Sequence, residues 1–311
     1  MLQKSKLIAL TLLMLIIGLV ACGDNNDTDD NGTNNNNESS NGVDLGDEDI
    51  TIAYVPWADY EARLHVIAQV LKNIGYNVDL KEMEAGPMFT SVSDGSADFT
   101  SMWLPSTHTE YWDEYQDNIE KVNQVLDKAP LSLAVPTYMA DDVDSIEDLK
   151  DNDSLGESVD WTITGIDPGA GIMMMTEKAM EEYELDNWNL EESSEAAMLA
   201  TLSEAYDNEE PIIFTGWEPH FMFGMWDLTL LDDPKEIYGG DGDQIFLVAR
   251  DDFESDSPAA YKVLEQYTEN YDRLNELMGD IEETGNPEEV AEQFVDDNED
   301  LVNEWTEGIA K

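Results

Sequence analysis

The sequence predicts an α/β protein of two lobes, each a sheet covered by helices, with a cleft between them. From residue 50 onward, strand-like and helix-like segments alternate, which is typical of parallel sheets packed against helices. The alternation starts again after residue 145, so we expect two such units. The length of 311 residues supplies enough chain for two buried cores.

The first lobe is predicted to open with a strand over 50–55 and a helix over 60–74. The helix has one apolar face, and Gly75 follows it as a typical C-terminal stop. Further strands are expected over 78–83, 98–102 and 131–135, with a helix that begins at Ser106 between the last two.

The second lobe repeats this pattern, and the chain then ends in helices. Expected strands cover 161–166, 188–192, 211–215 and 228–231, and expected helices cover 170–183 and 194–206. A strand over 244–249 follows where the chain returns to the first lobe. In the tail, Asn286 is a typical N-cap, Pro287 takes the first helical position, and Glu289 completes a capping box.

The charge of the chain is extreme and bears on its environment. There are 14 basic and 71 acidic residues, which gives a net charge of −57. Such a surface repels nucleic acid and anionic lipid, so most binding modes that use phosphates are excluded. It also repels itself at low ionic strength, whereas about 1 M salt shortens the Debye length to roughly 3 Å. We interpret the composition as adaptation to a salty environment.

The amino terminus predicts a secretory signal. Lys4 and Lys6 precede an apolar run over 7–20 that is too short to span a bilayer. The run ends in Leu-Val-Ala-Cys22, which resembles the lipobox of bacterial lipoproteins, in which the cysteine is lipidated. The alternative is an ordinary signal peptide that contains a cysteine by chance. Because Cys22 is the single cysteine, no disulfide, cysteine metal site or thiol nucleophile is expected.

The domain boundaries follow from composition and from the alternation of elements. Residues 23–48 are almost all polar or acidic and are expected to form a flexible tether. Within it, Asp27 to Glu38 matches an EF-hand calcium pattern, but no amphipathic helices flank it and we expect no metal there. The predicted division is 1–22 signal peptide, 23–48 tether, 49–136 and 245–311 lobe 1, and 137–244 lobe 2.

Three tryptophans lie where predicted strands end: Trp57, Trp103 and Trp217. Ligands of open α/β sheets bind outside the carboxyl ends of the strands. Three indole faces at that place would form a box for an organic cation, held by cation–π attraction. The alternative is that each tryptophan only fills the core. The last two share the form Trp-x-Pro, and we expect each proline to open the following helix.

Candidate groups for binding an anion lie at the same strand ends. His108 and His220 follow the two Trp-x-Pro turns, where each could donate a hydrogen bond or serve only as a local cap. The glycine-rich turn over 164–171 is neither a dinucleotide nor a Walker motif, but it offers backbone N–H groups to a carboxylate. A site that binds a cation between indole faces and a carboxylate through N–H groups would suit a zwitterionic ligand.

The motifs of common enzymes are missing from the sequence. It contains neither a Gly-x-Ser-x-Gly elbow nor a His-Glu-x-x-His pair. Carboxylate pairs are so frequent in this acidic chain that they indicate nothing, and a hydrolase that uses only carboxylates stays open as an alternative. We expect a binding protein without cofactor or metal, and not an enzyme.

Several blocks together resemble the glycine betaine substrate-binding lipoproteins of bacterial ABC importers, over essentially all of the chain after the tether. The blocks are Ala53-Tyr-Val-Pro-Trp57, Met102-Trp-Leu-Pro-Ser-Thr-His108, Val135-Pro-Thr-Tyr-Met139, Ser145-Ile-Glu-Asp-Leu-Lys150, Thr164-Gly-Ile-Asp-Pro-Gly-Ala-Gly171, Thr215-Gly-Trp-Glu-Pro-His220 and Asp233-Pro-Lys235.

This resemblance implies a two-lobed periplasmic binding protein-like fold of type II, with the ligand in the inter-lobe cleft. It implies that Trp57, Trp103 and Trp217 form a prism around a trimethylammonium group. It also implies that the backbone amides of Gly165 and Ile166 bind the ligand carboxylate, with His108 assisting. Phe221 stands where the family often has a second tryptophan, and we expect this difference to alter only the packing behind the three tryptophans. Val55-Pro56, just before Trp57, could shift the indole of that residue.

The expected partners follow from the resemblance: glycine betaine, the permease and ATPase subunits of an importer, and the outer face of the cell membrane through a lipid anchor. Close alternatives are receptors for choline, carnitine or proline betaine. Two alternatives belong to other classes. One is a secreted hydrolase that stacks sugars or peptides on tryptophan, and the other is a structural surface lipoprotein.

Overall fold

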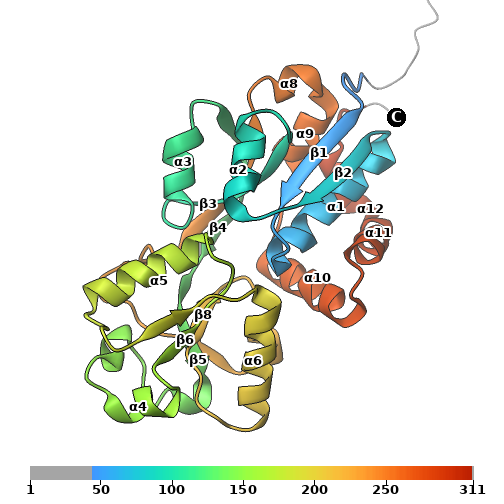
Figure 1. Ribbon diagram of the computed structural model, residues 1–311. Helices are drawn as coiled ribbons and strands as arrows, with labels where there is room; N and C mark the ends of the chain where they lie inside the picture. The colour runs from blue at the N-terminus through green and yellow to red at the C-terminus, as the bar shows by residue number, and fades with distance from the viewer. Residues whose placement is uncertain (1–43, 310–311) are drawn as a thin grey trace, which may run out of the picture. The chain divides into compact units, whose positions relative to one another are not determined.

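Each half of the fold is built on a five-stranded sheet (Figure 1), and equivalent strands follow one another in the same order in the two sheets. The first sheet has the order β2-β1-β3-β10-β4 and the second has the order β7-β6-β8-β5-β9. The strands of the first are β1 (Asp49–Tyr54), β2 (Asn77–Glu82), β3 (Phe99–Leu104), β4 (Ile119–Ala129) and β10 (Asp243–Arg250). Those of the second are β5 (Leu131–Pro136), β6 (Thr162–Thr164), β7 (Asn189–Glu191), β8 (Phe214–Trp217) and β9 (Leu228–Leu230).

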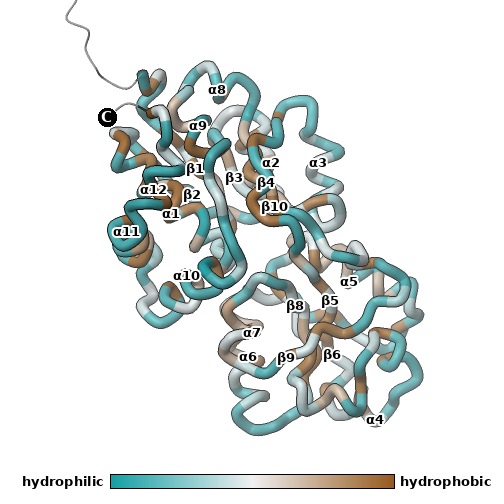
Figure 2. Tube along the Cα trace, turned by 180° about the vertical axis from the view of Figure 1, so that it is seen from behind, coloured by the Kyte–Doolittle hydropathy of each residue, from teal (hydrophilic) through white to brown (hydrophobic). Residues whose placement is uncertain are grey.

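Helices cover both sheets and complete two lobes. In the first lobe they are α1 (Ala58–Ile74), α2 (Ala85–Ser93), α3 (Thr109–Tyr115), α8 (Phe253–Asp256), α9 (Pro258–Gln266), α10 (Tyr271–Thr284), α11 (Pro287–Asp297) and α12 (Glu299–Trp305). In the second lobe they are α4 (Asp153–Ser158), α5 (Gly171–Glu182), α6 (Glu195–Asp207) and α7 (Met222–Met225). Figure 2 shows apolar residues gathered in central strands such as β5 and β6, and hydrophilic residues along much of α10 and α11.

The computed structural model describes residues 44–309, all within one compact unit. The predicted signal peptide with Cys22, and the Asp27 to Glu38 pattern, lie outside the described residues. Within 44–309, no helix is both long enough and apolar enough to cross a membrane.

The sheets are mixed, whereas the alternation of elements predicted parallel ones. β1 runs parallel to β2 and β3, but β10 is antiparallel to β3 and β4. In the second sheet β5 is likewise antiparallel to β8 and β9. Both reversed strands follow a crossing between the lobes. Such a strand enters its sheet without a covering helix from a neighbouring strand, so it need not run parallel.

The first crossing lies earlier in the chain than predicted. We expected lobe 1 to extend to residue 136, but β5 pairs with β8 and β9 of the second sheet. The chain therefore crosses at Pro130, directly after β4, and it returns before β10 at Asp243. Every residue of β5 is buried, and a continuous apolar strand carries no sign of which sheet it joins.

The structure also corrects three local expectations. β4 was missed, because its apolar residues do not alternate with polar ones but lie three or four positions apart, as in a helix, at 119, 122, 125, 126 and 129. The helix expected to begin at Ser106 begins at Thr109. The helix α2 was not predicted.

The expected tether is shorter than predicted, because its last residues already belong to the fold. The hydroxyl of Tyr76 donates to the carbonyl of Leu45 at 2.8 Å. The N–H of Asp47 donates to the carbonyl of Asp256, and Asn77 donates to Glu48. These bonds fasten the segment before β1 to α8 and β2, so the anchored part begins near residue 45 and not at 49.

Two predicted helix ends are confirmed. Gly75 ends α1 at φ 128°, a conformation that favours glycine, and its N–H donates to Leu71. At the start of α11, the Asn286 side chain accepts the N–H of Glu289 at 3.3 Å, as an N-cap does, and donates to its carboxylate at 2.9 Å. The backbone N–H of Asn286 donates to Thr284 Oγ1 at 3.3 Å, so Glu289 does not complete the predicted capping box.

A buried arginine joins α1 to the segment before α10. Arg63 is 0% exposed, and its guanidinium donates to both oxygens of Glu269, at 2.8 and 2.9 Å. It also donates to Asp59, one turn earlier, at 3.1 Å. The two carboxylates raise the pKa of Arg63 above its ordinary value although burial opposes this. The arrangement balances charges that would be costly to bury alone.

We predict that Arg63→Met lowers the free energy of unfolding by about 3–5 kcal/mol, because two buried carboxylates lose their common partner. Urea unfolding followed by circular dichroism measures the change. The control is Arg273→Met, since Arg273 forms no ion pair with any described residue. Equal stability of the two variants would contradict the assignment.

Candidate functional site

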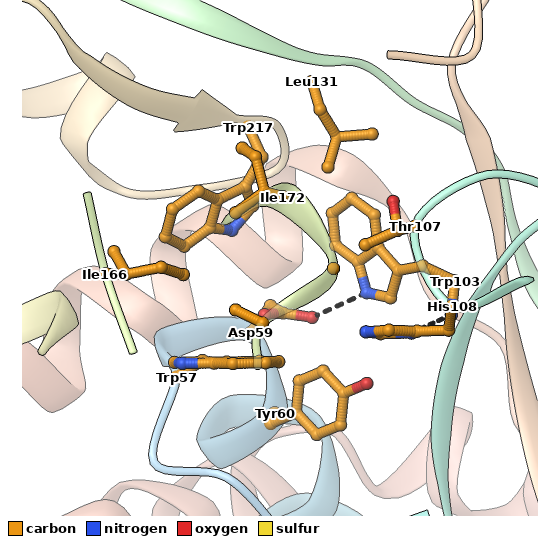
Figure 3. Close-up of a pocket in the computed structure, with 12 residues that line it drawn as sticks. Trp57, Asp59, Tyr60, Trp103, Thr107, His108, Leu131, Ile166, Ile172 and Trp217 are labelled. Atoms are coloured by element: carbon orange, nitrogen blue, oxygen red, sulfur yellow. Dashed lines mark hydrogen bonds between the residues drawn. The ribbon is translucent and has the colours of Figure 1, made fainter. Parts of the chain in front are cut away.

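A small cavity lies between the two lobes, with walls from both (Figure 3). The volume of the cavity is about 30 Å³, so its lining side chains lie close together. Its lining residues are Trp57, Asp59, Tyr60, Trp103, Thr107, His108, Leu131, Ile166, Ala170, Gly171, Ile172 and Trp217.

The structure places all three predicted tryptophans around this cavity. Trp57 follows β1 and is the N-cap residue of α1, Trp103 lies near the end of β3, and Trp217 is the last residue of β8. Figure 3 shows them on different sides of one space, with Trp57 seen edge-on beneath it. The strand ends of two separate sheets thus meet across the cleft.

Hydrogen bonds hold the polar edges of two indoles. Trp57 Nε1 donates to Asp167 Oδ2 at 3.0 Å, and Trp103 Nε1 donates to Asp59 Oδ2 at 3.3 Å. Tyr60 packs edge-on against Trp57, with ring centroids 5.4 Å apart. Because these edges are engaged and the rings are packed, the indoles cannot turn freely. Their π faces remain available to the cavity.

Asp59 is a cavity residue that the sequence interpretation missed. It is 1% exposed, and its Oδ2 accepts from Arg63 and from Trp103. It thus places a carboxylate beside the tryptophans, where it can attract a bound cation. Its spacing of four from Arg63 on α1 was the available sequence signal, but carboxylates are too common in this chain for it to stand out.

His108 lines the cavity as predicted, and its geometry sets its tautomer. Its Nδ1 accepts the backbone N–H of Trp103 at 2.9 Å, so the ring proton lies on Nε2. Figure 3 shows Nε2 on the side of the cavity. Burial lowers the pKa of His108 to about 3, which keeps the ring neutral at physiological pH. His108 is therefore a neutral donor, and its side chain does not cap α3.

The structure contradicts the expectation that the amide of Gly165 is free for a ligand. Its N–H donates to the carbonyl of Glu191 at 2.9 Å, beside the β6–β7 pairing. Ile166 does line the cavity, but its N–H donates to Met173 Sδ at 3.2 Å. A thioether is a weak acceptor, so only the Ile166 amide could readily be exchanged to an anion.

Two residues at the start of α5 also line the cavity. Gly171 and Ile172 are the first two residues of this helix, and their N–H groups make no hydrogen bond within residues 44–309. Because Gly171 has no side chain, its lining atoms are backbone atoms. The start of a helix favours an anion through free N–H groups and the helix dipole. Thr107 adds a buried hydroxyl that has no hydrogen-bond partner among the residues that the structure describes.

The two Trp-x-Pro turns differ from the prediction. Pro105 and Pro219 follow cis peptide bonds and lie in turns before α3 and α7, so neither opens a helix. His220 is buried behind Trp217, with ring centroids 4.8 Å apart, and does not line the cavity.

The lobes touch directly around the cavity. Besides the bond from Trp57 to Asp167, the hydroxyl of Tyr111 in α3 donates to the Gly169 carbonyl at 2.9 Å. The lobes are also close at Gly171, where an added Cβ atom would lie 2.0 Å from the backbone oxygen of Thr107. These contacts describe a closed cleft.

The site has aromatic faces and a carboxylate on one side, and neutral N–H donors elsewhere in its wall. That combination can enclose a small molecule with a cationic and an anionic end, and a fold of two lobes around such a cavity defines a two-lobed solute-binding protein. The family model for the substrate-binding domain of ABC-type glycine betaine transport systems matches residues 48–297. The chain belongs to this family, which is a family of transport proteins and not of enzymes.

Curated and solved relatives agree with this membership and confirm the resemblance found in the sequence. A glycine betaine/carnitine transport binding protein of Listeria monocytogenes is 43% identical over 159 residues, which cover 50% of this chain and 53% of that relative. The lactococcal protein OpuAC, solved closed with glycine betaine, is 34% identical with a TM-score of 0.77 and covers 84% of this chain and 100% of its own.

Two further structures extend the comparison. A glycine betaine/L-proline-binding protein of Borrelia burgdorferi is 29% identical, with a TM-score of 0.79 over 84% of this chain and 97% of its own. A choline-binding protein solved with choline is 26% identical, with a TM-score of 0.79 over 85% of this chain and 93% of its own. The predicted two-lobed α/β fold is confirmed by these matches.

We predict that Gly171→Ala hinders closure, because the new methyl group would collide with the Thr107 carbonyl. Affinity for glycine betaine, the ligand of the lactococcal structure, should fall at least about ten-fold, a loss of about 1.4 kcal/mol. Calorimetric titration measures it. Gly279→Ala in α10 is the control, since its added methyl group meets nothing within 4 Å. Unchanged affinity in Gly171→Ala would refute the contact's role in closure.

Proposed function

We propose that this protein is the substrate-binding receptor of an ABC importer and that it captures glycine betaine between its lobes. The observation that carries the proposal is the placement of Trp57, Trp103 and Trp217 around one cavity that also contains the Nε2–H of His108. The family membership supports the transport role.

The aromatic side of the cavity suits a quaternary ammonium group. Such a group has no N–H, so hydrogen-bond acceptors gain little from it, whereas desolvated indole faces contribute about 2 kcal/mol or more. The carboxylate of Asp59 adds an opposite charge beside Trp103. Closure of the lobes removes water and strengthens both attractions.

The ligand carboxylate would take the neutral donors. His108 Nε2 and the free amides of Gly171 and Ile172 supply N–H groups that carry no positive charge. The amide of Ile166 becomes available if the ligand replaces Met173 Sδ as its acceptor. This assignment keeps His108 and Ile166 from the sequence prediction and replaces Gly165 with the start of α5.

Choline is the main alternative, since a relative of similar fold was solved with choline. A carnitine receptor is supported by the name of the Listeria relative. Choline has the same cationic group but no carboxylate, so the donors at the start of α5 distinguish the two. Those donors favour glycine betaine in this chain.

The proposed setting is the outer face of the cell membrane. The sequence up to Cys22 supports export and lipid attachment, and the permease and ATPase of the importer would be the protein partners. A net charge of −57 fits a salty medium, in which cells gain from importing a compatible solute.

We predict that glycine betaine produces a saturable change in tryptophan fluorescence of the purified protein in high salt. Alanine at position 57, 103 or 217 should weaken binding by about 30-fold or more, because each removes a contact of about 2 kcal/mol. The matched control is Trp112→Ala, a half-buried tryptophan outside the cavity. Lack of response to both glycine betaine and choline in a folded protein would reject the proposal, and product formation from a sugar or peptide would favour the hydrolase.

We predict that His108→Leu weakens glycine betaine binding by about 10- to 100-fold, since a hydrogen bond to a charged group is worth about 1.5–3 kcal/mol. Choline affinity should change less than about three-fold, because choline has no carboxylate to which His108 could donate a hydrogen bond. Competition calorimetry with both ligands measures the difference. Equal losses for the two ligands would show that His108 only supports packing.

A further inference from the structure

Helix α1 begins without a cap of its own. Its N-cap residue is Trp57, which makes no side-chain capping bond, although Ser, Thr, Asp or Asn is usual there. The first helical N–H, that of Ala58, would then be unsatisfied. In this structure it donates to Glu195 Oε1 at 3.1 Å. Glu195 belongs to α6 of the second lobe, so the cap comes from across the cleft.

Glu195 is built into the interface between the lobes. It is 5% exposed, and its Oε1 accepts a second hydrogen bond from His220 Nε2 at 3.2 Å. His220 Nδ1 accepts the N–H of Met222, which places the ring proton on Nε2 and makes the histidine the donor. The other carboxylate oxygen, Oε2, is buried and has no hydrogen-bond partner in the described part of the chain.

The Glu195 carboxylate therefore contacts the neighbours of two of the three tryptophans that line the cavity, Trp57 and Trp217. On one side it holds Ala58, the residue after Trp57. On the other it holds His220, whose ring packs edge-on against Trp217. Neither Glu195 nor His220 lines the cavity, so their contacts act on the cage from outside.

We propose that Glu195 is the closing latch of this receptor: it caps α1 only when the lobes meet, and so links lobe closure to the seating of Trp57 and Trp217. The inference rests on the proposed function and adds a positioning residue to it. The helix dipole at the start of α1 favours an acceptor at this place.

The latch needs an oxygen acceptor and not a charge. Both bonds end on Oε1, which glutamine also possesses. Burial raises the pKa of Glu195, and the bonds from His220 and Ala58 oppose that rise. A glutamine should therefore preserve the latch, whereas an alanine should remove it.

Ligand release measured by stopped-flow tryptophan fluorescence tests the latch. For Glu195→Ala the release rate of glycine betaine should rise at least about ten-fold, with the association rate changed less than about three-fold. Glu195→Gln should stay within about three-fold of the unmodified protein. The matched control is Glu282→Ala, a carboxylate of the groove that Glu195 also lines, without a hydrogen bond to any described residue.

A second variant removes the donor in place of the acceptor. Ala58→Pro deletes the N–H at the first helical position, where proline is well tolerated, and Trp57 already has the extended backbone (φ −94°, ψ 144°) that must precede proline. Its release rate should rise like that of Glu195→Ala. The double variant should be no faster than Glu195→Ala alone, because the bond to Ala58 is already lost in that variant.

The thermal midpoint of the ligand-free protein separates a latch from a folding role. It should not fall in Ala58→Pro, since the bond from Ala58 to Glu195 forms only on closure and the bond from His220 to Glu195 is kept. An unchanged release rate, additive effects in the double variant, or equal losses of stability with and without ligand would each overturn the latch.

If the protein bound neither glycine betaine nor choline, the proposed function would be refuted. The latch would then be tested by a measurement that needs no ligand. Spin labels on Asp94→Cys and Glu157→Cys, in a Cys22→Ser background, report the distance between the lobes without ligand. A closed population that Glu195→Ala loses and Glu195→Gln keeps would support the latch. Identical distance distributions in the three proteins would reject it.

Discussion

The walls of the cavity depend on the hydrogen bonds that the buried guanidinium of Arg63 donates to two carboxylates. Arg63 holds Asp59, and Asp59 in turn accepts the indole N–H of Trp103. Its other partner, Glu269, joins this end of α1 to the segment that precedes α10. A single buried cation thus orients one aromatic wall and keeps a carboxylate beside the proposed position of the ligand cation. Charges buried so deeply tolerate little displacement, since each would lose its partner.

Closure completes a site that neither lobe contains alone. The first lobe supplies Trp57 and Trp103 with His108, and the second supplies Trp217 and the start of α5. The lobes approach so closely that only a glycine fits at Gly171. The contacts from Trp57 to Asp167 and from Ala58 to Glu195 add hydrogen bonds that require both lobes. Under the proposed function, the ligand is therefore enclosed by the same contacts that close the lobes.

The aromatic part of the site was more predictable than the polar part. Tryptophans at strand ends stand out in a sequence, because strand ends share one edge of a sheet and large aromatic side chains are rare. Asp59 was missed because a chain with 71 acidic residues hides a functional carboxylate among solvated ones. Gly165 was assigned to the ligand, but its N–H belongs to a backbone hydrogen bond with Glu191, which spacing along the chain cannot reveal.

The sequence by itself determined the α/β alternation, the two lobes, the cage tryptophans and caps such as Asn286, because these follow from local periodicity and from side chains that act on their nearest neighbours. Tertiary structure decided which sheet receives β5, which amides stay free, and that Glu195 caps α1 from the other lobe. Those outcomes depend on partners far apart in the chain. A buried strand or a glutamate has many partners of equal chemistry, and only packing selects one of them.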